Sequence, residues 1–474
     1  MEPVSLERRL TTRDATLLTI GAVVGSGIFL TTSDIAAHLP HAGWIVLVWV
    51  AGGLLSLAGA LTYAELGAMY PRAGGMYHYV KEAYGPLWGF LFGWAAFWVI
   101  MSGGNAALAV GFGKYFGGFF PYFSVDHVLW SVPLGSFVWK VNGAQAAGAV
   151  AIVALTAINV RGLKAGAGTQ NALTWLKAGA IAFLIVAGFV FTAKVDPVWW
   201  GSAAGAAQAA SDAAAPASSI WLLFGAAMVG ALWTYDGWYG ATFSTGEMKD
   251  PARSLPRGLI YGTIAVTVLY VAVNVVYARA MTPQQMAGSA RIGEDAAAVF
   301  AGPTAAKGVA LAIVLSTLGC LASTILYASR IYGPMAEDGL FFKGLAKIDP
   351  RTHVPVRSLW AQAAWSVVLT LSGTYEQLYT YVIFAGLLFH VATAAAVFVL
   401  RRTRSRLERP YRVWGYPVTP ILFIGASLLL VGNTLASSPV ESLVGLGILA
   451  AGLPAYLVWR RGARVIAASG TQSK

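Results

Sequence analysis

The stretch GAVVGSGIF at residues 21–29 interrupts a hydrophobic segment that runs from residue 14 to residue 38. A second hydrophobic segment, residues 219–246, contains the aromatic and kink-prone stretch WTYDGW at residues 233–238. A helix that is interrupted inside a bilayer leaves backbone N–H and C=O groups free, and such groups are tolerated only where protein or a cavity surrounds them. Two interrupted segments at corresponding positions of two halves therefore predict the substrate site of a secondary transporter.

The composition is typical of an integral membrane protein. Hydrophobic residues make up 57% and charged residues 11% of the chain, and the mean hydropathy is +0.65. A soluble domain carries about 25% charged residues, so that class is excluded. The hydropathy predicts an all-α polytopic membrane protein with twelve membrane-spanning helices. These are residues 14–38, 43–69, 87–118, 143–161, 169–193, 219–246, 257–281, 304–335, 357–373, 376–401, 416–436 and 442–460.

The distribution of basic residues predicts the orientation. With the N-terminus inside, 25 of the 32 Lys and Arg residues fall on cytoplasmic segments and the span ends beside them, six fall outside, and one lies within a span. This bias places both termini in the cytoplasm, so we expect a multi-pass protein of the cytoplasmic (inner) cell membrane. The basic cluster at residues 401–412 can indicate nucleic acid or anionic lipid, but an ordinary cytoplasmic loop accounts for it.

Three ionisable side chains lie well inside predicted spans, and each is a functional candidate because burying it costs roughly 2.5–3.5 kcal/mol. Glu65, toward the inner end of its span, is interpreted as structural and paired with a loop cation. Lys177 has no acidic neighbour in its span, so it needs acceptors from another span or must become neutral. Asp236 lies in the second interruption, either as a substrate ligand or as the cap of a half-helix.

Other functional classes find little support in the residues. The closest histidine pair, His38 and His41, lies at a short loop without a cysteine, so we expect no metal site, no cofactor and no enzyme activity. The single cysteine, Cys320, excludes a disulfide framework. A channel stays open on composition alone. Saturable turnover that depends on substrate at the far side would separate a carrier from a channel.

Several short motifs, in order along the chain, resemble those of a known family. They are GSGIF at 25–29, YPRAGGMY at 70–77, LWTYDGW at 232–238, GEMKDP at 246–251, ERPY at 408–411 and SPVES at 438–442. Together they resemble the amino acid–polyamine–organocation superfamily and, within it, the L-amino acid transporter family. Animal members of that family are the light subunits of heteromeric amino acid transporters. The similarity covers nearly the whole chain.

The resemblance implies two inverted repeats of five helices, with the last two helices outside the repeat. The boundaries expected on this basis are a cytoplasmic N-terminus at 1–13, the first repeat at 14–193, the second repeat at 219–401, spans 11 and 12 at 416–460, and a cytoplasmic tail at 461–474.

The resemblance also implies which atoms of the first interruption hold the substrate. The carboxylate of an α-amino acid would bind the free amides of Ser26 and Gly27, beside a half-helix N-terminus whose partial positive charge favours an anion. The ammonium group would bind the carbonyl of Val23 on the same span. These contacts recognise what all amino acids share.

In the second interruption, the resemblance assigns the remaining ammonium contacts to the carbonyls of Trp233, Thr234 and Asp236. The Trp233 ring matches the aromatic gate that covers the substrate from outside. Many relatives that prefer large neutral substrates have glycine where this chain has Asp236. A carboxylate there favours a cationic side chain.

Lys177 matches a position whose ammonium stands in for the cation of sodium-coupled relatives of this fold. It would bind carbonyls near Ala22 and the hydroxyls of Ser323 and Thr324, and so help to couple and gate transport. A lysine that snorkels from a displaced span is the alternative.

The expected function is secondary active transport of L-amino acids by alternating access, as sodium-independent exchange of neutral and, through Asp236, cationic amino acids. Proton symport is the alternative. Residues 119–142 contain no cysteine with which to join a heavy subunit, so we expect no obligate disulfide-linked partner.

Overall fold

The structure, a computed structural model, describes residues 10–72, 74–134, 137–161, 163–191, 197, 199–200, 220–352 and 354–470. Its helices are α1 (Thr12–Val23), α2 (Thr31–His38), α3 (Ala42–Met69), α4 (Met76–Tyr84), α5 (Pro86–Ala95), α6 (Met101–Phe116), α7 (Gly143–Val160), α8 (Leu163–Phe191), α10 (Ile220–Tyr235), α11 (Pro251–Ala280), α12 (Pro283–Ala287), α13 (Ile292–Glu337), α14 (Val356–Ser372), α15 (Tyr375–Thr403), α16 (Val418–Ser437) and α17 (Pro439–Gly470). Short 3-10 or π segments are η1 (Gly27–Phe29), η2 (Ala96–Ile100), η3 (Pro121–Phe123), η4 (Gly240–Glu247) and η5 (Lys343–Ala346).

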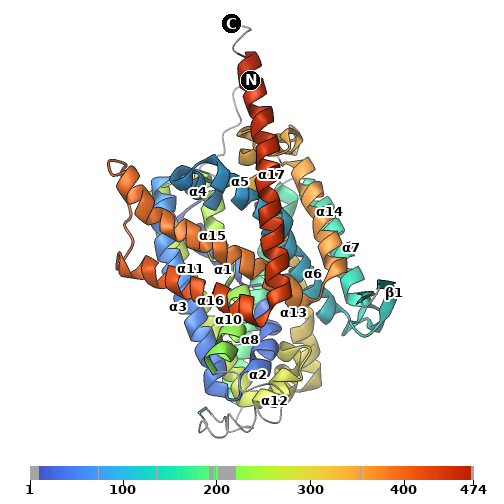
Figure 1. Cartoon of the computed structure of the whole chain (residues 1–474). Helices are drawn as coiled ribbons and strands as arrows, with labels where there is room; N and C mark the ends of the chain where they lie inside the picture. The colour runs from blue at the N-terminus through green and yellow to red at the C-terminus, as the bar shows by residue number, and fades with distance from the viewer. Residues whose placement is uncertain are drawn as a thin grey trace.

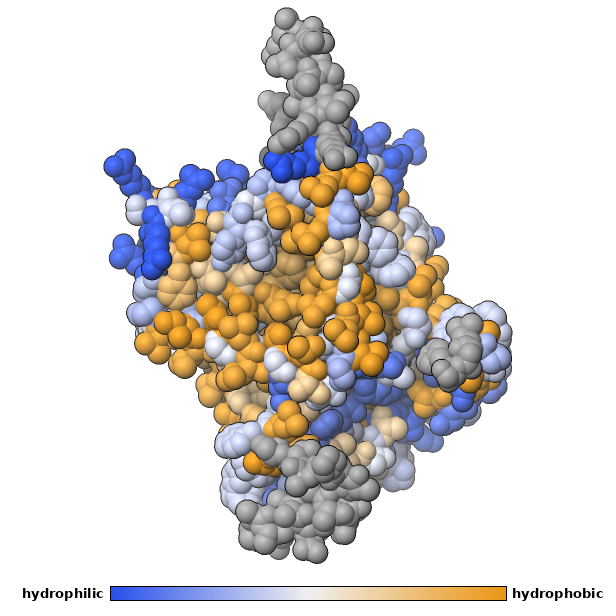
Figure 2. Space-filling model, in the orientation of Figure 1, coloured by the Kyte–Doolittle hydropathy of each residue, from blue (hydrophilic) through white to orange (hydrophobic). Residues whose placement is uncertain are grey.

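The helices form one bundle with two polar ends and an apolar belt between them. In Figure 1, α4, α5 and the last turns of α17 lie at one end, which we call the α4 end. The helices α2 and α12 lie at the opposite end, which we call the α12 end. Figure 2 shows the belt on the face formed by α16 and α17, where Leu422, Leu429, Leu443 and Val458 are exposed. Such a surface is typical of helices that face lipid.

Within the described residues, nine helical segments are long and apolar enough to cross a membrane. The other three predicted spans also coincide with helices. Residues 14–38 form α1, η1 and α2, residues 169–193 overlap α8, and residues 357–373 match the shorter α14. The first of these is interrupted, α8 is a continuous helix of 29 residues, and α14 has 17 residues.

The interruption of the first hydrophobic segment is confirmed. The helix α1 ends at Val23, the chain continues through Gly25 and Ser26 into η1, and α2 begins at Thr31. Glycine is required at position 27 because a Cβ atom there would lie 2.6 Å from Thr234 Oγ1. The helix α10 therefore packs directly on the interrupted backbone.

The interruption of the second segment is also confirmed. The helix α10 ends at Tyr235, a turn follows, and η4 begins at Gly240. Gly237 in this turn has a φ of +98°, which L side chains rarely adopt, and a Cβ atom on it would lie 2.8 Å from the carbonyl oxygen of Ala22. Each interruption thus approaches the backbone of the other.

Several elements between the predicted spans were not expected. Strands β1 (Val128–Leu134) and β2 (Phe137–Asn142) form an antiparallel hairpin between α6 and α7. The short helices α4 and α12 lie at the two ends of the bundle (Figure 1). The helix α13 begins 12 residues before the predicted span at residue 304 and is kinked at Gly302, where φ is +81°.

Glu65 has the structural role that its sequence position predicts. Its carboxylate accepts hydrogen bonds from Arg401 at 2.9 and 2.6 Å and from the backbone N–H of Val413 at 2.8 Å. Arg409 lies 3.5 Å from the same carboxylate, and the guanidinium of Arg401 stacks on the ring of Tyr416 at 3.6 Å. This cluster joins α3 to the end of α15 at the α4 end, away from the interruptions.

Candidate substrate site

A small cavity of about 40 Å³ lies where the two interruptions meet. One buried water needs about 10–15 Å³ by the same kind of measure, so the cavity has room for a few water molecules. The helices α1, α6, α10 and α13 and the segments η1 and η2 form its wall. Of the predicted site residues, those that line it are Ala22, Val23, Gly27, Trp233, Thr234, Asp236 and Thr324.

The α1 interruption contributes backbone donors to this region. The hydrogen bonds that open η1 are donated by the N–H of Phe29 to Ser26 and by the N–H of Leu30 to Gly27. The amides of Ser26 and Gly27 therefore precede the first donor of the new helical segment, where N–H groups have no intrahelical acceptor. Both residues are buried, and ionisable side chains are absent from residues 21–29.

The carbonyl groups of the two interruptions lie close to each other. The hydroxyl group of Tyr270, on α11, donates to the carbonyl of Val23 at 3.1 Å and to that of Thr234 at 3.3 Å. The carbonyl of Trp233 accepts the N–H of Asp236 at 3.1 Å. Since a carbonyl oxygen has two lone pairs, these groups keep the capacity to accept a further donor.

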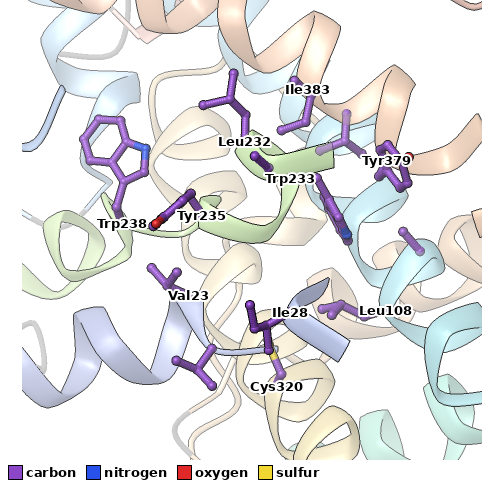
Figure 3. Close-up of a cluster of buried hydrophobic side chains, with 14 of the residues drawn as sticks. Val23, Ile28, Leu108, Leu232, Trp233, Tyr235, Trp238, Cys320, Tyr379 and Ile383 are labelled. Carbon is purple, nitrogen blue, oxygen red and sulfur yellow. The ribbon is translucent and has the colours of Figure 1, made fainter. Parts of the chain in front are cut away.

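Trp233 lies between the cavity and the α12 end. Its indole N–H donates to the hydroxyl of Tyr375 at 2.8 Å, and its ring stacks on Tyr379 with a centroid distance of 6.0 Å and an interplanar angle of 17°. Figure 3 shows Trp233 pointing from α10 toward Leu108, with Tyr379 beside it. The hydroxyl of Tyr379 donates to Asp34 of α2 at 3.1 Å, so the ring is held from α15 and, through Tyr379, from α2.

Asp236 lines the cavity from the turn after α10. Its carboxylate accepts a long hydrogen bond of 3.5 Å from Tyr239 in the same turn. A second, smaller cavity borders Asp236 on the side of Trp238 and His390. Asp236 thus borders two cavities, and its one side-chain hydrogen bond is long.

Lys177 contacts carbonyl groups of the first interrupted segment near Ala22. Its ammonium group donates to the carbonyls of Gly21 at 2.9 Å and Val24 at 3.0 Å, which flank Ala22. The side chain is 4% exposed. The carbonyl of Ala22 itself lies 4.0 Å from the thiol of Cys320.

The hydrogen bonds expected from Lys177 to Ser323 and Thr324 are not formed in this structure and stay a prediction. These hydroxyl groups donate to Gly319 and Cys320 within α13, at 2.8 and 2.9 Å. Hydroxyl groups on helices often donate to the carbonyl four residues earlier, and their oxygen atoms can still accept a hydrogen bond from a cation.

Sequence reasoning missed the tyrosines that organise the site. Tyr270, Tyr375 and Tyr379 lie within apolar runs, where an aromatic residue is ordinarily read as packing. Their hydroxyl groups acquire partners only because α11 and α15 pack against α1, α2 and α10. Tyr327 and Cys320 also line the cavity, and no pattern in the sequence predicts this position for either residue.

Among the residues that the structure describes, no group of three or more His, Cys, Asp or Glu side chains could hold a metal ion. The His38 ring instead contacts the carbonyl oxygen of Asp34 at 2.8 Å.

Comparison with known proteins shows the family to which the chain belongs. The family model described as "Amino acid permease" matches residues 10–450. The chain is 31% identical to the serine/threonine exchanger SteT of Bacillus subtilis (strain 168), over 93% of this chain and 94% of that protein. It is 29% identical to the b(0,+)-type amino acid transporter 1 of Mus musculus, over 93% and 85% of the two chains. It is 28% identical to the large neutral amino acids transporter small subunit 2 of Homo sapiens, over 96% and 81%.

Proposed function

Because the chain belongs to the amino acid permease family, a family of multi-pass membrane transport proteins, we propose that it exchanges L-amino acids across the cytoplasmic membrane. The observation that carries this proposal is the meeting of two interrupted helices around one buried cavity, with backbone donors on the first and carbonyl groups on both. An α-amino acid carries a carboxylate and an ammonium group on one carbon atom, and both find partners in such a place.

In this proposal the substrate carboxylate binds the amides of Ser26 and Gly27, where the partial positive charge of the half-helix favours an anion. The ammonium group binds the carbonyls of Val23, Thr234 and the turn at Asp236. All of these contacts come from the protein backbone and bind the carboxylate and ammonium groups that every α-amino acid has. The site therefore accepts amino acids with different side chains. The cavity of about 40 Å³ requires the walls to move before a whole amino acid fits.

We further propose that the bundle has twelve spans, arranged as two inverted repeats at 14–193 and 219–401 and two further spans at 416–460, with segments 1–13 and 461–474 in the cytoplasm. The α4 end then faces the cytoplasm. The basic cluster at residues 401–412 adjoins that end and supports this orientation.

Lys177 is proposed to take the place of a bound sodium ion. A single ammonium group joins α8 to two carbonyls at the end of α1, as a cation between two helices would. An ammonium group presents three donors and can release a proton, so proton symport is the second candidate function, supported by the same contact.

Trp233 is proposed to close the site toward the outside, and Asp236 to favour substrates with a cationic side chain. The contacts of Trp233 with two residues of α15 support the first role. The position of Asp236 at the cavity wall supports the second.

The protein is proposed to act without a disulfide-linked heavy subunit. Its single cysteine, Cys320, is 3% exposed in α13 and lies beside the α1 interruption, where a covalent link to another chain is sterically excluded.

Uptake into proteoliposomes tests the proposed function. Purified protein is reconstituted, and uptake of labelled L-serine, L-alanine and L-arginine is measured with empty vesicles and with vesicles loaded with unlabelled amino acid. Exchange predicts uptake that depends on the internal amino acid and is indifferent to sodium. Uptake into empty vesicles that follows an imposed pH gradient favours the symporter, and no uptake under any condition overturns both.

A further inference from the structure

A third and much larger cavity opens at the α12 end. Its volume is about 1070 Å³, against about 40 Å³ for the cavity at the interruptions. Its walls come from the end of α6, the β2 strand, and the starts of α7, α15 and α17. All of these segments lie on the side that the proposed orientation assigns to the outside. We call this cavity the vestibule.

An ion pair in the vestibule lies directly next to the gate. The ammonium group of Lys114, on α6, lies 2.6 Å from a carboxylate oxygen of Glu376, on α15. It also lies 5.0 Å from the ring centre of Tyr375, whose hydroxyl group accepts the indole N–H of Trp233 at 2.8 Å. Lys114, Tyr375 and Glu376 line the vestibule, whereas Trp233 lines the inner cavity. Tyr375 and Trp233 thus lie between the ion pair and the inner cavity.

The ion pair is open to solvent on the vestibule side. The side chains of Lys114 and Glu376 are 22% and 41% exposed. A partly solvated pair contributes little to stability, so a ligand that offers matching charges can exchange with it at low cost. A zwitterionic amino acid offers these charges, a carboxylate for Lys114 and an ammonium group for Glu376.

Other charges of the vestibule are less suited to this role. Arg291 is already bound to Glu294 at 2.8 Å. Lys140 lies on the β2 strand, and Glu441 lies on α17. The cation that lies over the ring of Tyr375, next to the gate, is Lys114.

We propose that Lys114 and Glu376 form a transient second site for the zwitterionic amino acid, which the substrate occupies before it enters the inner cavity. Binding separates the two side chains, since Lys114 turns to the carboxylate and Glu376 to the ammonium group. Lys114 then leaves the ring of Tyr375, and Tyr375 is free to release Trp233. The vestibule site rests on the proposed function and adds to it a recognition step that precedes gate opening.

The kinetics of the variant Glu376→Gln distinguish a substrate site from an ion pair that only holds the gate shut. If the ion pair only held the gate shut, its loss would increase the population of molecules open to the outside, and the KM for external amino acid would fall. If it recognises the zwitterion, the KM for external substrate rises about tenfold, as expected for the loss of one charge-assisted contact, while the maximal rate changes little. The two readings differ in the sign of the change.

The measurement is initial uptake of labelled amino acid into intact cells of a strain that lacks uptake of that amino acid, so that every molecule has the same orientation. Glu376→Gln and Lys114→Gln are expected to raise KM to a similar extent. Glu441→Gln is the matched control, because it removes a carboxylate from the same vestibule away from the gate. Gel filtration of each purified variant establishes that it is folded.

An unchanged or lower KM in both folded variants, with normal uptake by the wild type, overturns the vestibule site alone. A rise of the same size in Glu441→Gln also overturns it, because a general loss of negative charge would then explain the effect. Absence of uptake by the wild type overturns the proposed function, and the vestibule site with it.

Discussion

The two interruptions face the same cavity but are built from different chemistry. The one between α1 and α2 consists of glycines, a serine and apolar residues, and its contribution is backbone. The one after α10 presents an indole ring, a hydroxyl group and a carboxylate, from Trp233, Thr234 and Asp236. A backbone amide cannot tell one amino acid from another, whereas side chains can. The comparison suggests that the first interruption binds the part common to all substrates, and the second controls gating and selectivity.

The two interruptions also depend on each other for their shape. Thr234 leaves no room for a Cβ atom on Gly27, and the carbonyl of Ala22 leaves none for a Cβ atom on Gly237. A change of volume in the first interruption is therefore expected to damage the whole site, while changes of side chain in the second are expected to have graded and substrate-dependent effects.

The largest effect is expected from Gly27→Val. A Cβ atom at this position would lie 2.6 Å and 2.9 Å from side-chain atoms of Thr234 and 3.0 Å from its Cα atom, so the two interruptions must separate. Binding of amino acid to the purified variant is expected to fall by more than about 100-fold, as for a misplaced set of ligands. Gly21→Ala is the control, since a Cβ atom there meets nothing within 4 Å. Normal affinity in a folded Gly27→Val protein would remove the α1 interruption from the site.

A smaller but still large effect is expected from Lys177→Ala, which tests whether the first interruption needs support from α8. The change removes two hydrogen bonds to the carbonyls of Gly21 and Val24. We expect the exchange rate to fall about 100-fold, with substrate affinity altered less than turnover, because the contact holds α1 rather than the ligand.

The exposed Lys307 of α13, changed to alanine, provides the matched control for Lys177. Exchange by Lys177→Ala at the wild-type rate from mildly acidic to mildly alkaline pH would contradict both the ion-substitute and the proton-switch role.

An intermediate effect is expected at Trp233. Trp233→Ala removes the ring that separates the cavity from the vestibule, and exchange is expected to slow about tenfold or more. Trp233→Phe keeps a ring to stack on Tyr379 and loses only the hydrogen bond to Tyr375, so its rate is expected to stay within about threefold of the wild type. Tyr375→Phe loses the same bond and is expected to match Trp233→Phe. Equal rates for the alanine and phenylalanine variants of Trp233 would indicate packing rather than gating.

The smallest and most selective effect is expected at Asp236. Asp236→Asn keeps the shape of the side chain and removes its charge, so a cationic substrate loses an opposite charge and a neutral one does not. Competition assays with arginine and alanine are expected to show arginine weakened about tenfold more than alanine. Parallel losses for the two amino acids would assign Asp236 to the local structure of the turn.

Much of the architecture could be predicted because the bilayer imposes it. Where backbone N–H and C=O groups are unpaired in a long apolar segment, the sequence contains glycine or a polar residue among aromatic ones. Both interruptions were predicted from this signal. The hairpin of β1 and β2 could also have been found. The sequence Gly135-Ser136 lies between two runs rich in valine and aromatic residues, which is a hairpin signal.

The pairing of side chains between helices could not be predicted. The partner of Lys177 was placed near Ala22, within two residues of its actual contacts, because a family resemblance supplied the helix pair. The choice between the carbonyls of Gly21, Ala22 and Val24 depends on how α1 is rotated against α8, and no spacing in the sequence encodes that rotation. Tyr270 was missed for the same reason, since its two acceptors belong to two other helices.

The central claim is that the two interruptions together bind the α-carboxylate and α-ammonium groups of the substrate. It is tested most directly by equilibrium binding to the purified protein of L-alanine and of L-alaninamide, which keeps the ammonium group and the side chain but lacks the carboxylate. The account predicts saturable binding of L-alanine, competed by other small L-amino acids, and at least about a 100-fold weaker interaction with L-alaninamide. Equal affinity for the two ligands would contradict it, because the amides of Ser26 and Gly27 would then have no part in recognition.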